Sequence, residues 1–95
     1  MDPKEKEAIE ADRLFKLKLV MDETVKFPTE YLFKFIVPVS AVHQIMLILH
    51  GMDIDERASS SGKYISVSGR KVFENSDEII AIYKRASVIQ GIISL

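Results

Sequence analysis

The order of hydrophobic periodicities between residues 30 and 95 restricts this chain to a small number of folds. Strands alternate apolar and polar side chains every second residue, whereas amphipathic helices repeat every 3.6 residues. The segments that follow one rule or the other are, in chain order, strand 30–37, helix 41–50, strand 53–59, strand 64–72, helix 76–86 and strand 88–95. The sequence therefore predicts the order β-α-β-β-α-β.

Turn and cap residues stand at the predicted boundaries. Pro38 ends the first strand because it cannot donate to a sheet ladder, and Gly51 stands where a helix C-cap glycine belongs. Gly62 lies in the turn between the second and third strands, and Asn75 with Glu78 resembles a capping box. We expect an α+β fold: a ferredoxin-like βαββαβ sandwich with a four-stranded antiparallel sheet in the order 4-1-3-2 and two helices on one face.

Residues 1–26 form a highly charged extension to this plan. They hold 13 of the charged residues, whereas the remaining 69 residues hold 14. Asp2 can cap a helix and Pro3 suits its first turn, so we expect a helix from about residue 4 to residue 21. We divide the chain into an N-terminal extension, 1–26, and a ferredoxin-like domain, 27–95. The net charge of −1 excludes binding to nucleic acid or anionic lipid by bulk charge alone.

Lys34 decides which side of the predicted sheet faces the helices. Burying an unpaired ammonium group is costly, so Lys34 belongs on the side that the two sheet helices leave open. Phe33 and Phe35 then point toward the helices, whereas Leu32 and Ile36 lie with Lys34 on the open face. The direction of this one side chain therefore fixes the expected map of both faces.

The open face predicted in this way carries an apolar patch. The patch could be covered by the N-terminal helix, by a second copy of the chain, or by nothing. Helix 41–50 is apolar on most sides, which also favours contact with another chain. In the last strand we expect Ile89, Ile93 and Leu95 to face the core. The candidate interface residues are Leu14, Leu17 and Met21 of the N-terminal helix, Leu32, Ile36, Val88 and Ile92 of the open face, and Leu47 and Ile48 of helix 41–50.

Composition and motifs give no support for catalysis or metal binding. The chain has no Cys, so thiolate metal sites, iron–sulfur clusters and cysteine nucleophiles are excluded. His43 and His50 are seven residues apart, which places their Cα atoms about 10 Å apart on a helix, too far for one metal ion. Phosphate-binding glycine motifs and the serine-hydrolase elbow are absent. We expect no enzyme activity, no cofactor and no metal.

One turn could hold an anion. Residues 59–63 offer backbone N–H groups and hydroxyls suited to phosphate or carboxylate, although such turns most often serve only as hairpin connections. An RNA- or nucleotide-binding domain is the alternative function, but RNA-binding sheets of this plan use several exposed aromatic side chains and here Tyr64 stands alone. The candidate ligand-binding residues are Lys34, Arg57, Ser59, Ser60, Gly62, Lys63, Tyr64 and Ser66.

Three stretches of the sequence resemble the YbeD-like family of small bacterial proteins. They are Phe27-Pro28-Thr29, Ser59-Ser60-Ser61-Gly62-Lys63-Tyr64-Ile65-Ser66-Val67-Ser68, and Val88-Ile89-Gln90-Gly91-Ile92-Ile93-Ser94-Leu95. The resemblance covers roughly residues 27–95, and residues 31–38 after a front helix look like the Bacteroidetes-type members. It implies a fold close to ACT regulatory domains, which bind small effectors at dimer interfaces, and no established catalytic activity. Members usually carry a basic residue where Ser61 stands here, which weakens the case for an anion in the turn.

These observations predict a non-enzymatic, ACT-like binding module. We expect it to be cytoplasmic, to form a homodimer, and to regulate by binding a small effector or a partner protein. The longest apolar run, residues 45–49, is far shorter than the ~20 residues of a spanning helix, so we expect no membrane contact. Nucleic acid is not expected to be the main partner.

Overall fold

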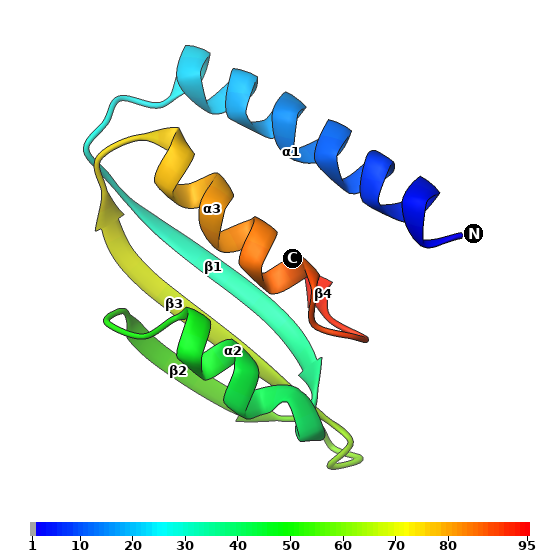
Figure 1. Ribbon diagram of the computed structural model, residues 1–95. Helices are drawn as coiled ribbons and strands as arrows, with labels where there is room; N and C mark the ends of the chain where they lie inside the picture. The colour runs from blue at the N-terminus through cyan, green and yellow to red at the C-terminus, as the bar shows by residue number, and fades with distance from the viewer. Residues whose placement is uncertain (1) are drawn as a thin grey trace.

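A computed structural model describes residues 2–95 of the chain, with helices and strands as labelled in Figure 1. Its elements are α1 (Pro3–Thr24), β1 (Thr29–Pro38), the 3₁₀ turn η1 (Val39–Ala41), α2 (Val42–Ile48), β2 (Asp53–Ala58), β3 (Tyr64–Phe73), α3 (Ser76–Ser87) and β4 (Ile93–Ser94). None of the helices in residues 2–95 has the length and apolar character needed to cross a bilayer.

The four strands form one antiparallel sheet in the order β2-β3-β1-β4. Counted from the opposite edge, the order is 4-1-3-2. β1 and β3 pair along their whole length, from Thr29 opposite Phe73 to Pro38 opposite Tyr64. β2 and the two-residue β4 are the edge strands. The predicted α+β class and four-stranded antiparallel sheet are therefore confirmed.

The two faces of β1 differ as the position of Lys34 predicted. Phe33, Phe35 and Val37 are 0% exposed in the core beneath the helices, whereas Lys34 is exposed on the opposite side. The ring of Phe33 packs edge-on against Tyr83 of α3, with centroids 5.0 Å apart. Aromatic pairs in this arrangement add to the free energy gained from burial alone. The helix-facing side of the sheet is therefore a filled aromatic core.

Helix α1 lies beside α3 in the helix layer and does not cover the open face (Figure 1). The carboxylate of Asp2 caps it by accepting hydrogen bonds from the N–H groups of Lys4 (2.7 Å) and Glu5 (3.1 Å). Leu14 and Met21 are buried in the same core as the β1 aromatics, and Leu17 packs against it. The prediction that these three residues could cover the open face is wrong, because they fill the α3 side of the core instead.

A polar cluster joins α1 to the start of α3. Lys18 Nζ lies 3.0 Å from Asp22 and 3.2 Å from Asp77, and it donates to Ser76 Oγ at 3.1 Å. The Ser76 hydroxyl, which is 2% exposed, donates in turn to Asp22. Asn75 caps α3 by accepting from the Glu78 N–H, as expected from its position. The cluster holds α1 at one place and orientation along α3.

The C-terminal segment is the largest departure from the predicted fold. Residues 88–92 form a turn, because the Ile89 N–H donates back to Ala86 O (3.0 Å) and Gly91 takes a φ of +80°. A glycine is suited to that left-handed conformation. The strand expected over 88–95 is therefore reduced to Ile93–Ser94, followed by one bond from the Leu95 N–H to Lys34 O.

This turn reverses the faces predicted for the last strand. Ile93 lies opposite Ile36 on the open face, and Ser94 lies opposite Phe35 on the helix side. Leu95 follows Ile93 by two residues and so shares the open face. The predictions that Ile93 and Leu95 face the core and that Ile92 lies on the open face are therefore wrong. Val88, also predicted on the open face, stands at the end of α3 and is 82% exposed.

Candidate functional site

The open face of the sheet carries an exposed apolar corner made of Leu32, Ile36, Ile93 and Leu95. Leu32 and Ile93 are 50% exposed, Leu95 is 65% exposed, and Ile36 is half-buried. The corner spans β1, β4 and the residue after β4. Two of the predicted interface residues, Leu32 and Ile36, therefore belong to it. Ile93 and Leu95 were missed because the turn at Gly91 changes the parity of the strand.

The other predicted interface residues lie elsewhere. Leu47 is exposed on α2, and Ile48 packs partly against the core. Val88 lies at the end of α3, outside the sheet, and Ile92 packs against the core next to β4. These four residues do not extend the apolar corner.

A small polar hollow occupies the β2–β3 side of the open face. It has a volume of about 140 Å³ and is lined by Lys34, Asp55, Arg57, Ser66 and Ser68. Three of the predicted ligand residues, Lys34, Arg57 and Ser66, thus come together through strand pairing. Asp55 and Ser68 were not among the predicted ligand residues, although the alternation of β2 and β3 puts both on this face. Asp55 offsets part of the positive charge.

The remaining ligand candidates lie in the β2–β3 turn, whose polar groups bind one another. Ser59 Oγ accepts from the Tyr64 N–H (3.2 Å), and Ser59 O accepts from the Gly62 N–H (3.0 Å). Ser61 Oγ accepts from the Lys63 N–H (3.3 Å). Gly62 has a φ of +74°, as its place in the turn predicted. The N–H groups of Gly62, Lys63 and Tyr64 are therefore already satisfied within the hairpin and are not left for an anion. The segment that holds Ser59, Ser60, Gly62, Lys63 and Tyr64 connects β2 to β3.

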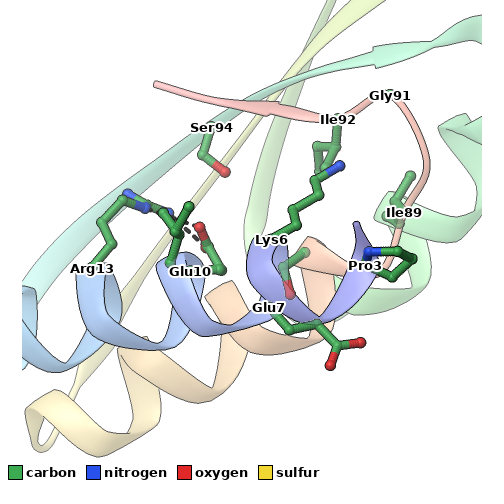
Figure 2. A pocket seen from close by; sticks show the side chains of 11 residues that line it. Pro3, Lys6, Glu7, Glu10, Arg13, Ile89, Gly91, Ile92 and Ser94 are labelled. Atoms are coloured by element: carbon green, nitrogen blue, oxygen red, sulfur yellow. Dashed lines mark hydrogen bonds and ion pairs between the residues drawn. The ribbon is translucent and has the colours of Figure 1, made fainter. Parts of the chain in front are cut away.

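A second cavity lies where no part of the sequence analysis expected one, and we call it the α1 cleft. It is a volume of about 640 Å³ between the first half of α1 and the turn that leads into β4 (Figure 2). No motif could have revealed it, because its two walls come from opposite ends of the chain. Its lining residues are Pro3, Lys6, Glu7, Ile9, Glu10, Arg13, Ser87, Ile89, Gly91, Ile92 and Ser94.

At one end of the α1 cleft, a charged pair lies against the buried Tyr83, which is bonded to the partly buried Tyr31. Arg13 Nε and Nη2 donate to the two carboxylate oxygens of Glu10 at 3.1 and 2.8 Å, and this bonding raises the pKa of Arg13. The guanidinium carbon lies 6.0 Å from the ring centre of Tyr83. The Tyr83 and Tyr31 hydroxyls are 2.7 Å apart. Burial first, and then this hydrogen bond, raises the pKa of Tyr83 far above its ordinary value, so the phenol stays protonated and is unsuited to act as a base.

The contact between Lys18 and Ser76 also indicates a structural role. Hydrogen bonds to Asp22 and then to Asp77 raise the pKa of Lys18, so its ammonium group stays charged and cannot accept a proton from Ser76. A nucleophilic serine needs a neighbouring base, and Ser76 is moreover buried. Within residues 2–95, no group of three or more His, Asp or Glu side chains is placed to hold a metal ion, and His43 and His50 are both exposed.

Comparison with models of protein families, with curated proteins and with solved structures gave no match.

Proposed function

We propose that this protein is a non-catalytic regulatory module that self-associates through the open face of its sheet. The observation that carries the proposal is the apolar corner, which no part of the chain in residues 2–95 covers. The N-terminal helix was the internal candidate for covering it, and α1 packs on the opposite side of the sheet. A second copy of the chain is the occupant that we propose.

The size of the open face fits a homodimer that associates weakly. The four strands together hold 28 residues. At ~4.8 Å between strands and ~3.3 Å per residue, they give a face of roughly 440 Å². Two such faces in contact would bury roughly 900 Å², which is below the ~1,200–2,000 Å² of a standard interface and falls in the range of weak contacts. Leu32, Ile93 and Leu95 would then leave water together, which is the main favourable term in association.

The charges on the open face also allow two copies to meet. Strand pairing places Lys34, Arg57 and Arg70 on this face together with Glu30, Asp53 and Asp55. Arg70 Nε already lies 3.7 Å from the Glu30 carboxylate. Equal numbers of positive and negative groups avoid the like-charge repulsion that opposes self-association. The face is therefore suited to contact with a copy of itself.

The ferredoxin-like, ACT-like and YbeD-like assignments support the regulatory part of the proposal by analogy. The strand order and the two sheet helices fit the first of these descriptions, and α1 is an addition to it. By the same analogy we propose a cytoplasmic module that responds to a small effector or a partner protein.

Sedimentation equilibrium tests the self-association. The wild-type chain should sediment as a dimer, and Leu32→Glu should sediment as a monomer because it places a charge at the centre of the contact. Leu47→Glu is the matched control, since Leu47 is similarly exposed at 59% but lies on α2. A monomeric wild type at high concentration, or a dimer that Leu47→Glu disrupts and Leu32→Glu does not, would refute the proposal.

Nucleotide binding is the second candidate function, favoured by the presence of Lys34 and Arg57 in the polar hollow. Tyr64 is 44% exposed and offers one surface for base stacking. Filter binding of a short single-stranded RNA at low salt tests it, where electrostatic contacts are strongest. Retention that Arg57→Gln abolishes would favour this function over the first, and no retention would end it.

A further inference from the structure

The α1 cleft has the size of a small-molecule site. Its volume of about 640 Å³ lies within the ~300–1,000 Å³ typical of ligand pockets, whereas the polar hollow on the open face, at about 140 Å³, is too small. The cleft lies on the helix side of the sheet, because Ser94 faces α1 there. It is thus separate from the surface proposed for self-association.

One wall of the cleft is apolar and fixed in place. Ile89 is 5% exposed, and its N–H group donates to Ala86 O at 3.0 Å. Ile92 packs partly against the core and donates its own N–H to Ile89 O at 3.4 Å. On the opposite wall, Ile9 of α1 is 55% exposed. An aliphatic chain placed between these walls would lose contact with water on both sides.

The charge that faces this apolar wall is positive. Figure 2 shows the Lys6 side chain reaching from α1 toward Ile92, whereas the Glu7 carboxylate points away from the β4 segment. Glu10 is held by the guanidinium of Arg13. Across the chain from residue 2 to residue 95, Lys6 takes part in no ion pair. Its ammonium group is therefore available to an anion.

The other hydrogen-bonding groups of the cleft fit the same kind of ligand. Arg13 has five N–H donors, of which two bind Glu10, so further donors remain for a second carboxylate. The carbonyl groups at the end of α3 are less available to a cation, because Ala86 O accepts from Ile89 and Lys84 O accepts from the Ser87 hydroxyl. The cleft thus offers cationic donors beside an apolar wall.

We infer that the α1 cleft binds an amphipathic organic anion, a carboxylate with an aliphatic chain. The carboxylate lies at Lys6, and the chain lies between Ile9 and the Ile89–Ile92 turn. This inference rests on the proposed function in one respect, since it supplies the class of effector for a module that is otherwise defined by its self-association.

Isothermal titration calorimetry with octanoate tests the inference. Octanoate should bind the wild-type chain, whereas acetate, which lacks the chain, and octanol, which lacks the charge, should bind at least tenfold more weakly. Lys6→Gln should weaken octanoate binding about tenfold, which corresponds to about 1.4 kcal/mol. Lys4→Gln is the matched control: it removes the same charge from the same helix turn, and Lys4 does not line the cleft. Its affinity should equal that of the wild type.

Backbone amide chemical shifts in the same titration locate the ligand. The amides of Gly91, Ile92 and Ser94 should shift in the wild type, and they should shift much less in Lys6→Gln at the same subsaturating octanoate concentration. No binding of octanoate, equal loss in Lys4→Gln and Lys6→Gln, or shifts confined to the open face would overturn the inference.

Sedimentation of the same samples separates this inference from the proposed function. Lys6→Gln should leave the oligomeric state unchanged, and Leu32→Glu should leave octanoate affinity unchanged. A wild-type chain that forms the dimer and does not bind octanoate refutes the cleft alone, whereas a monomeric wild-type chain that binds octanoate refutes only the self-association.

Discussion

The two faces of the sheet differ in how completely their apolar side chains are covered. On the helix side, α1, α2 and α3 enclose Phe33 and Phe35, which are 0% exposed. On the open side, their neighbours in the same strand, Leu32 and Ile36, remain in contact with water. The chain therefore contributes a third helix to the face that two helices already protect. The helix side therefore provides the burial that stabilises the fold, whereas the open side keeps exposed apolar surface that is available for association.

Neighbouring substitutions in β1 give the largest test of this contrast. Phe33→Ala should lower the free energy of unfolding by about 3–5 kcal/mol, because it leaves a cavity among four other aromatic rings. Leu32→Ala should change it by less than about 0.5 kcal/mol in the dissociated chain. Urea unfolding at low protein concentration measures both. Similar losses at the two positions would mean that the faces do not differ.

A substitution with a smaller effect tests whether α1 packs on the helix side of the sheet. Leu14 is 2% exposed against α3, so Leu14→Ala should lower the free energy of unfolding by about 2 kcal/mol, the lower end for a buried leucine. Phe15→Ala is the control, since Phe15 is 59% exposed on the outer side of the same helix turn and should be nearly neutral. A neutral result for Leu14→Ala would show that α1 is not packed against α3.

The pH dependence of stability gives the smallest effect and probes the junction of α1 with α3. The hydrogen bond from Ser76, and then that from Lys18, lowers the pKa of Asp22 in the folded state. Its contribution to stability is therefore complete above the ordinary aspartate pKa of ~3.9 and is lost as the pH falls through the lower folded value. Thermal unfolding of wild type and Asp22→Asn should differ at neutral pH and converge in strong acid. A constant difference down to pH ~2 would contradict this assignment.

The features that could be predicted from the sequence depended on local periodicity. The alternation in 30–37 gave the strand and, through Lys34, both of its faces. Asn75, Gly51 and Gly62 marked a cap and two turns that the structure contains. Each of these signals depends on only a few neighbouring residues, so the local sequence is enough to locate the strand, cap or turn.

The features that could not be predicted depended on contacts between distant segments. One left-handed residue, Gly91, lies in the turn that replaces residues 88–92 of the expected last strand and exchanges the faces of the remainder. Because successive strand residues alternate sides, a shift of one position moves every side chain across the sheet. The position of α1 could not be predicted either, because Leu14, Leu17 and Met21 could pack against either face of the sheet. The α1 cleft depends on that position, so it could not be predicted.

A distance between two copies of the chain tests the central claim most directly. The sequence has no Cys, so Leu32→Cys and, separately, Leu47→Cys can each carry one spin label. Pulsed dipolar spectroscopy should give a defined distance between labels at position 32 that is shorter than the distance between labels at position 47, because in the proposed dimer the open faces meet and the helices point outward. A shorter distance at position 47, or no signal between copies at either position, would contradict the account.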